Sequence, residues 1–299
     1  MNTRKTVVAL IVVAIVSFAI GGLIFKMLLK TYEINEEKTL RMEDADILRI
    51  ETVSADVNII PSESGEIRAV LHGTMASSNK DNAAKLEIDK TGQNISIKTK
   101  YPRRFFSFDE KERIYLDIYV PKNYTHELVI HGVSGNGKIE GMNLKSVEFT
   151  TISGNLSAQN ISAEMKFKSE SGDLTLDRNR GGINADTQSG NINVDYAIFQ
   201  NLVEAKTVSG SITLYVPKES CFDLDFRTGS GKLNTDIPLK INSISKKSDE
   251  ILHGVHCTKS DVKLVGSINL STNSGNLDIR NGAVLTNTEL IESRRGITE

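Results

Sequence analysis

The chain contains 299 residues, of which 39% are hydrophobic and 25% are charged, with a formal net charge of −2. This length allows one or two domains with a substantial hydrophobic core. The nearly neutral charge lacks the basic excess typical of nucleic-acid binding, so we expect no nucleic-acid partner. The 22 glycines and only 5 prolines, together with many Ser, Thr, Asn, Ile and Val residues, favour β structure.

Residues 6–25 read TVVALIVVAIVSFAIGGLIF and contain no charged side chain. A helix of this length spans about 30 Å, the thickness of a bilayer core, whereas a buried core helix would usually carry a polar face. A cleavable signal peptide would have a shorter apolar region that ends in a small-residue site. Because the apolar run instead continues as KMLLK over residues 26–30, we expect an uncleaved signal anchor, a single transmembrane helix over residues 6–25.

Basic residues stand on both sides of this segment, so their distribution favours a cytoplasmic N-terminus only narrowly. The head formed by residues 1–5 is too short to carry a function. We therefore expect the head to be cytoplasmic and the large domain to be extracytoplasmic, held at the cell membrane by a single pass. Residues 26–43 are charged and polar, and they are predicted to form a stalk.

A Ser-Gly pair recurs from residue 134 onward, and the first six pairs of this series are separated by 19, 18, 18, 20 and 21 residues. Apolar residues stand six and four positions before most of these serines, and Ser or Thr usually stands two before. Asn or Asp commonly stands two after, and apolar residues follow at three and five. The pairs are Ser134–Gly135, Ser153–Gly154, Ser171–Gly172, Ser189–Gly190, Ser209–Gly210, Ser230–Gly231 and Ser274–Gly275.

This alternation on both sides of a corner predicts two short, half-buried strands in each unit. Glycine would serve the corner because it adopts positive φ without a Cβ clash, and Asn or Asp would bond the nearby backbone. Units of about 18–21 residues predict an all-β protein, a β-solenoid resembling a parallel β-helix, in which each coil stacks on the one before it. Residues 132–281 would form this solenoid, and residues 282–299 would form a polar tail.

The same template continues upstream in a looser form. Ala55 takes the glycine place in one unit, and Gly92 takes the serine place in another. Residues 44–131 are therefore predicted to be an irregular β cap that protects the end nearer the membrane, because an open coil would expose unpaired strand edges. Between Ser230 and Ser274 lie 44 residues, which would hold about two coils and an irregular insertion.

The units TISGNLSA, ESGDLTL, QSGNINV, VSGSITL and NSGNLDI resemble those of the DUF4097 family of candidate adhesins, over roughly residues 45–280. Members are bacterial β-strand-repeat proteins, often tethered by one transmembrane helix, and they include LiaG-like proteins linked to cell-envelope stress operons. The resemblance implies a non-catalytic envelope role. It supplies no catalytic, metal or cofactor residues.

The motif HGVHC, which contains His253, His256 and Cys257, is the best metal candidate, although a polar insertion between coils is the simpler interpretation. Cys221 and Cys257 could form one disulfide bond or remain two free thiols. The recurring Asn and Asp could suggest calcium, but the calcium-binding nonapeptide repeat is absent. Motifs for phosphate binding or for known hydrolases are absent as well, so no cofactor, metal or catalytic residue is predicted.

The segment YPRRFFSF, residues 101–108, combines basic and aromatic side chains. Arg103 and Arg104 could meet lipid phosphates or a partner while Phe105 and Phe106 enter the interface. The simpler alternative is that the phenylalanines fill the core of the cap.

Three functions are compatible with these features. The first is a non-catalytic, membrane-anchored cell-envelope protein, with a rigid β-repeat surface that contacts an envelope protein or wall polymer in an envelope-stress response. The second is a scaffold that self-associates through the ends of its solenoid. The third, an envelope carbohydrate-active enzyme, would require a cluster of acids that the sequence does not place.

Overall fold

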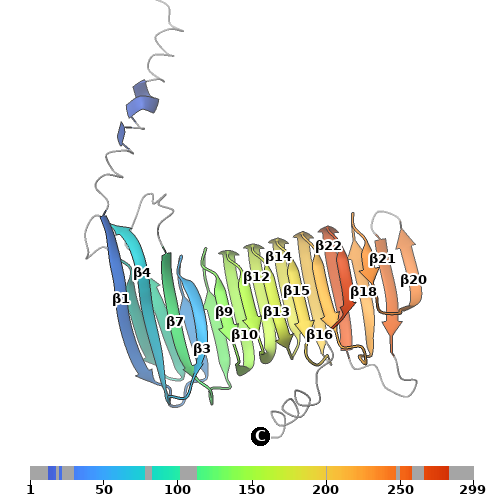
Figure 1. The fold of residues 1–299 in the computed structure, drawn as a ribbon, viewed down its shortest axis with the longest axis horizontal. Helices are drawn as coiled ribbons and strands as arrows, with labels where there is room; N and C mark the ends of the chain where they lie inside the picture. The colour runs from blue at the N-terminus through green and yellow to red at the C-terminus, as the bar shows by residue number, and fades with distance from the viewer. Residues whose placement is uncertain are drawn as a thin grey trace, which may run out of the picture.

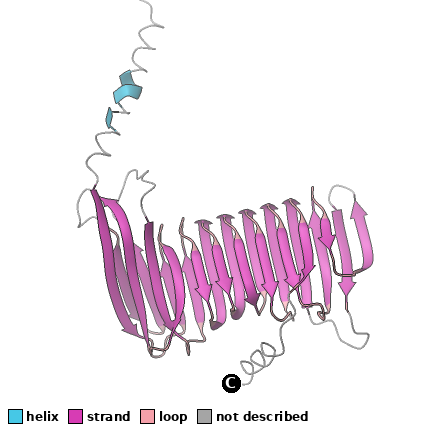
Figure 2. Cartoon of the chain, in the orientation of Figure 1, coloured by secondary structure: helices cyan, strands magenta, loops and turns pink. Residues whose placement is uncertain are grey.

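The computed structural model describes residues 13–17, 20–21, 30–77, 83–101, 113–199, 201–246, 250–257 and 266–282. Residues 13–17 and 20–21 are helical, and the folded body is built from strands (Figure 2). No helix among the described residues is long and apolar enough to cross a membrane. The transmembrane helix expected over residues 6–25 thus falls mostly outside the described residues and stays a prediction.

The body consists of two large sheets that run along its length (Figure 1). The 11-stranded sheet has the order β1 (Lys30–Arg41), β4 (Glu66–Ser77), β7 (Arg113–Pro121), β3 (Asp56–Ser62), β9 (Gly137–Glu140), β11 (Leu156–Gln159), β13 (Leu174–Asn179), β15 (Ile192–Tyr196), β17 (Ile212–Val216), β23 (Leu277–Asn281) and β19 (Leu233–Thr235). The 12-stranded sheet has the order β20 (Lys240–Lys246), β21 (Glu250–His256), β18 (Phe222–Thr228), β22 (Gly266–Ser274), β16 (Leu202–Ser209), β14 (Ile183–Ser189), β12 (Ser162–Ser171), β10 (Asn143–Ser153), β8 (Glu127–His131), β2 (Ile47–Glu51), β6 (Asn94–Lys100) and β5 (Lys85–Thr91).

Each regular coil contributes one strand to each sheet, and equivalent strands of neighbouring coils pair in parallel. In the middle of the stack Phe149 pairs with Phe167, and Phe167 pairs with Ala185. The two phenylalanine rings lie parallel, with centroids 5.9 Å apart. Because every second residue points between the sheets, these columns form one continuous hydrophobic core. The predicted all-β solenoid is therefore confirmed over the repeat region.

The segment predicted to be a stalk is part of the folded body, which corrects the sequence-based boundary. Residues Lys30–Arg41 form β1, and this strand pairs with β4 in antiparallel fashion over its whole length. Ile34 is buried, although most of the strand is exposed. The many charged residues of this segment suggested a linker, but they suit an edge strand whose outer side faces water.

The cap predicted over residues 44–131 is more regular than expected. Its strands β2 and β3 form one coil of the stack, and β6 and β7 form another coil outside it. The strands β1, β4 and β5 make only antiparallel pairs among the described residues, with one another or with β6 and β7, and they close this end. The solenoid therefore begins well before residue 132.

The opposite end is assembled out of sequence order. β22, which ends at Ser274, lies between β16 and β18, so the coil containing Ser230 is outside the coil containing Ser274. The antiparallel strands β20 and β21 then cover β18. The expectation that each coil stacks on the preceding one is wrong here, because all coils present the same columns and the repeat pattern cannot specify which neighbour a coil takes.

Candidate functional site

The Ser-Gly pairs singled out from the sequence lie along one side of the body, where the chain turns from the 12-stranded sheet into the 11-stranded sheet. We call this side the corner edge. Ser153, Ser171, Ser189, Ser209 and Ser274 follow one another in register from coil to coil. At the far end, the hydroxyl oxygens of Ser230 and Ser274 are 3.1 Å apart. The structure thus brings the predicted corner residues together in a single row, and all of these serines are exposed.

The corner glycines are needed for close stacking and not for an unusual backbone conformation. A Cβ atom added to Gly172 would lie 2.0 Å from the carbonyl oxygen of Gly154, and one added to Gly190 would lie 2.1 Å from that of Gly172. Neither Gly172 nor Gly190 has a positive φ, and the φ angles of 159° at Gly210 and 158° at Gly275 correspond to extended backbone, not to the left-handed region. The sequence-based explanation through positive φ is therefore wrong, because the backbone of the neighbouring coil occupies the space that a side chain would need.

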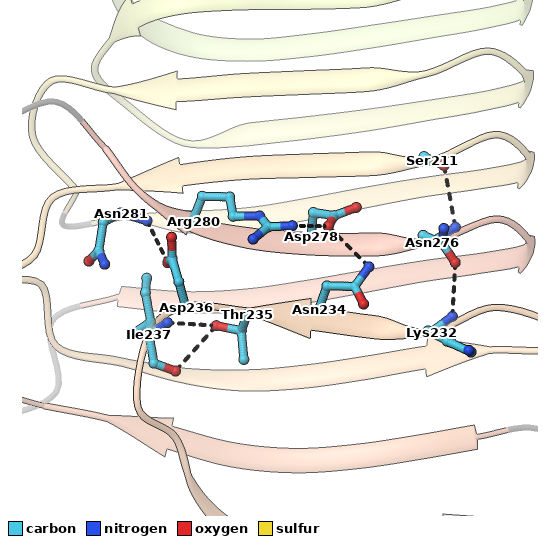
Figure 3. A network of polar contacts seen from close by, with 10 residues as sticks. All are labelled: Ser211, Lys232, Asn234, Thr235, Asp236, Ile237, Asn276, Asp278, Arg280 and Asn281. Atoms are coloured by element: carbon cyan, nitrogen blue, oxygen red, sulfur yellow. Dashed lines mark hydrogen bonds and ion pairs between the residues drawn. The ribbon is translucent and has the colours of Figure 1, made fainter.

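The residue two positions after each corner serine forms a polar ladder. The backbone N–H of Asn155 donates to Oδ1 of Asn136 at 3.0 Å, and the N–H of Asp173 donates to Oδ1 of Asn155 at 2.8 Å. The last side-chain acceptor of the ladder is Asn276, whose own N–H donates to the Ser211 hydroxyl and whose Oδ1 accepts from Lys232 N–H (Figure 3). From one end to the other it comprises Asp56, Asn136, Asn155, Asp173, Asn191, Ser211, Asn276 and Lys232.

The hydroxyl column two positions before the corner serine supports the same turns from inside. Thr207 donates to the carbonyl oxygen of Gly190 at 3.1 Å, and Thr272 donates to that of Gly210 at 3.1 Å. Both threonines are at most 3% exposed. The carbonyl groups of Gly190, Gly210 and Gly275 thus gain a donor where the tight stacking of glycines leaves little room for water. Two members of the same column, Ser169 and Thr187, are buried without such a bond to any described residue.

A shallow polar depression of about 360 Å³ lies over the middle of the corner edge, between Asn136 and Ser189. The ladder oxygens that line this depression already accept hydrogen bonds from backbone N–H groups. Asn and Asp side chains that bond the backbone are the alternative to calcium binding. Among the described residues no group of three His, Cys, Asp or Glu side chains could hold a metal ion. The Asn and Asp of the corners therefore hold the stack together, and the depression offers hydroxyl and amide groups to a ligand.

A second group, which the sequence analysis missed, lies on the outer face of the 11-stranded sheet near β1. Asp117 is its centre: one carboxylate oxygen accepts from Asn58 Nδ2 at 2.6 Å, and the other is 2.9 Å from His72 Nε2. We call this group the outer-face cluster; its members are Asn58, Arg68, His72, Tyr115, Asp117 and Tyr119.

Two tyrosine rings frame the outer-face cluster. Tyr115 stacks on His72 with ring centroids 5.4 Å apart, and the guanidinium of Arg68 lies 3.9 Å from the centroid of Tyr119. All six side chains are partly exposed. The signal for this cluster was the strand sequence YLDIY at residues 115–119, whose outward positions carry Tyr, Asp and Tyr where a solvated strand usually carries small polar residues.

Two carboxylates, Asp177 and Asp195, stand side by side on β13 and β15 of the same outer face. Burial raises the pKa of Asp195, and repulsion from Asp177 raises it further, while Arg178 acts in the opposite direction. The carboxylate of Asp177 also accepts a hydrogen bond from Gln159 at 2.7 Å. Paired carboxylates alone do not define a catalytic centre, because structural networks perturb pKa values in the same way.

The HGVHC motif has a structural role at the end of the stack. Cys257 forms a disulfide bond with Cys221, which settles the alternative that the sequence left open in favour of a bridge. His256 is buried with Nδ1 2.7 Å from the carbonyl oxygen of Pro238, and His253 pairs with Asp225. The disulfide bond therefore gives the motif a structural role: it joins the end of β21 to the start of β18. We call this connection the end clamp.

Arg103, Arg104, Phe105 and Phe106 lie outside the described residues, so their proposed contact with a membrane or partner stays a prediction. The described residues on either side of this segment, Tyr101 and Arg113, follow β6 and begin β7.

Together these features define an all-β solenoid of two sheets, with a polar corner ladder and with antiparallel strands at both ends. The chain belongs to the DUF4097 family, described as Toastrack, whose profile matches residues 45–180 and again residues 138–280. The resemblance seen in the sequence is therefore confirmed. No curated protein matches the chain.

Solved structures with a similar arrangement come from several bacteria. A candidate cell adhesion protein from Clostridium sporogenes is 13% identical, with a TM-score of 0.39, and the match covers 84% of this chain and 100% of that one. A candidate adhesin from Bacteroides fragilis is 12% identical, with a TM-score of 0.41 and coverage of 83% and 97%. A candidate lipid-binding protein from Parabacteroides distasonis is 15% identical, with a TM-score of 0.35 and coverage of 81% and 96%.

Proposed function

We propose that this protein is a non-catalytic cell-envelope protein that presents its rigid body, from a membrane anchor at residues 6–25, to a wall polymer outside the cell. The anchor rests on the uninterrupted apolar sequence of that segment. The extracytoplasmic side is supported by the Cys221–Cys257 disulfide, because such bonds persist mainly in oxidising compartments.

The observation that carries the proposal is the outer-face cluster. Its tyrosine rings, each stacked on one side by His72 or Arg68, are partly exposed and offer apolar surface to sugar rings. Asp117, His72 and Asn58 bond to one another, and their remaining donors and acceptors are offered to the sugar hydroxyls. The cluster is built on β3, β4 and β7; β7 pairs with both of the others, and this pairing holds the side chains in fixed positions. A preorganised surface of this kind binds without losing much conformational entropy.

The ladder residues at the repeated corners give no support to a catalytic role, because their side chains serve the structure. Ladder residues such as Asn155 and Asp173 use their side-chain oxygens to bind the backbone of the next coil. Self-association through coil ends required an open terminal coil. The strands β1, β4 and β5 cover one end, and at the other end β20 and β21 cover β18 in the 12-stranded sheet, so that the only edge a terminal coil offers among the described residues is the three-residue strand β19 of the 11-stranded sheet. The polymer-binding module is therefore the better proposal.

Binding of the full-length protein, in detergent or nanodiscs, to purified wall fractions tests this function. The double variant Tyr115→Ala with Tyr119→Ala should lose binding at least tenfold. The control is Tyr215→Ala, because Tyr215 is 40% exposed on β17 of the same sheet but lies far from the cluster. Equal binding by all three proteins would remove the cluster from the proposal, and no binding by the unaltered protein would remove polymer contact altogether.

Protease accessibility on intact cells tests the location separately. Added protease should reach the body and leave a short membrane-protected fragment. A body that is cleaved only after the cells are opened would reverse the proposed orientation.

A further inference from the structure

The chain enters the folded body on the corner edge. Lys30, the first residue of β1, pairs with Ser77 at the end of β4. The end of β4 also pairs with the start of β7, and β7 runs parallel to β3, which begins directly after the first corner. The starts of β1, β7 and β3 therefore lie on the same side of the 11-stranded sheet (Figure 1).

Little chain separates this point from the apolar segment. Only residues 26–29 lie between Phe25 and Lys30, and they can span at most about 17 Å when fully extended. β1 is paired with β4 from its first residue to its last, so none of its residues can lengthen the connection to the apolar segment. If residues 6–25 cross the membrane, the corner edge next to β1 must lie close to the bilayer surface.

This part of the corner edge carries a strip of exposed apolar side chains. Val53, Val133 and Ile152 are 47%, 41% and 49% exposed, and each directly precedes a corner serine. They are neighbours in consecutive coils, because Ser134 N–H donates to the carbonyl oxygen of Val53 and Ser153 N–H donates to that of Val133. With neighbouring strands about 4.8 Å apart, the three lie about 14, 19 and 24 Å along the sheet from β1.

The strip has a defined end. The residues that continue the same column in the next two coils are Glu170 and Gln188, both of which are exposed. The run of consecutive apolar corners therefore ends at Ile152, and Val208, which is 45% exposed and precedes Ser209, stands apart from it further along the column. On the side of chain entry the coil of β6 and β7 lies between the strip and β1, and the corner of that coil falls outside the described residues. The three consecutive apolar corners lie near the point of chain entry, where a membrane that holds the anchor could cover them.

We propose that Val53, Val133 and Ile152 form a lipid-contact strip that rests the anchor-proximal part of the corner edge on the membrane surface. Contact removes half-exposed apolar side chains from water, and the tether keeps them at high effective concentration near the lipid. Glu170 marks the limit of contact, because its carboxylate stays in water. The inference rests on the proposed membrane anchor, and it fixes the orientation in which the outer-face cluster would meet its polymer.

Environment-sensitive fluorophores on single added cysteines test this orientation. The full-length protein, with its native disulfide intact, is reconstituted into phosphatidylcholine–phosphatidylglycerol vesicles that contain a spin-labelled lipid. Labels are placed by Val133→Cys and by Glu140→Cys. Both positions belong to the same coil, but Val133 lies at the corner between β8 and β9, whereas Glu140 is the last residue of β9, on the side of the body opposite the corner edge. Glu170→Cys reports the end of the strip, and Val13→Cys reports whether the apolar segment is inserted.

We expect the label at position 133 to shift its emission to the blue and to be quenched by the spin-labelled lipid several-fold more than the labels at positions 140 and 170. Equal quenching at 133 and 140, with position 13 in lipid, would overturn the lipid-contact strip and leave the anchor intact. A label at position 13 that stays in water would overturn the anchor itself. Protection of position 133 from aqueous iodide without lipid quenching would indicate contact with protein and would also refute the inference.

Discussion

Replacing one corner glycine by alanine tests whether close stacking of coils, and not backbone conformation, fixes the corners. Gly172 is suitable because it lies in the middle of the stack and has no positive φ. Its new Cβ would lie 2.0 Å from the carbonyl oxygen of Gly154 and 2.9 Å from the carbonyl carbon. Both atoms belong to the backbone, so the two coils must separate locally by about an ångström to reach ordinary contact distances.

The cost can be estimated from the contacts that this separation disturbs. Overpacking in a close-packed interior costs about 1–3 kcal/mol. Asp173 N–H, which follows directly, would also lose its 2.8 Å bond to Asn155, at about 1 kcal/mol. We therefore expect Gly172→Ala to lower the free energy of unfolding by about 2–4 kcal/mol, and the Tm by about 5–15 °C for a domain of this size.

Thermal and urea unfolding followed by circular dichroism measure this loss. Gly65→Ala is the matched control, because Gly65 also follows a serine, Ser64, but lies between β3 and β4, where an added Cβ would meet nothing within 4 Å. The control should stay within about 0.5 kcal/mol of the unaltered protein. Equal stability of the two variants would refute the stacking explanation of the corners.

Three further predictions concern the ladder, the end clamp and the partly buried carboxylate of Asp195. Asn155→Ala removes the acceptor for Asp173 N–H and should cost about 1 kcal/mol in urea unfolding, since water can partly replace an exposed acceptor; a loss above about 3 kcal/mol would contradict this account. Replacing Cys221 and Cys257 together by serine opens a loop with a sequence separation of 36 residues and should cost up to about 4 kcal/mol, with faster hydrogen exchange in β18 and β21; unchanged exchange there would argue against the clamp. Because the folded-state pKa of Asp195 is raised, its ionisation disfavours the folded state as the pH rises through the ordinary carboxyl range, so Asp195→Asn should be more stable than the unaltered protein at pH 7 and should lose this advantage below about pH 4; an advantage that does not change with pH would exclude ionisation as its cause.

The repeat could be read from the sequence because its periodicity reflects local geometry. Residues such as Phe149 and Phe167 alternate with polar neighbours, and this alternation alone places them between two sheets. The pair Ser-Gly by itself is not sufficient, since Ser64–Gly65 lies in a turn between β3 and β4 and not at a corner. What distinguishes a corner is the apolar and hydroxyl pattern on both sides of it.

The outer-face cluster could not be found in this way. Asn58, His72 and Asp117 are far apart in the chain and meet only because β3, β4 and β7 become neighbours. The sequence also could not show why glycine is needed at the corners. The backbone atom that an added Cβ would meet belongs in each case to a different coil.

The sequence by itself determined the all-β class, the length of each coil and the two strands that each coil contains, since these depend on the alternation of side chains along one short segment. Only the tertiary structure decided the order of the coils at the ends, the incorporation of Lys30–Arg41 as an edge strand and the pairing of Cys221 with Cys257. Every coil offers the same backbone hydrogen bonds and the same apolar columns to any neighbour. The order of the coils, such as the place of β22 between β16 and β18, therefore depends on contacts between residues distant in the chain and not on the repeat itself.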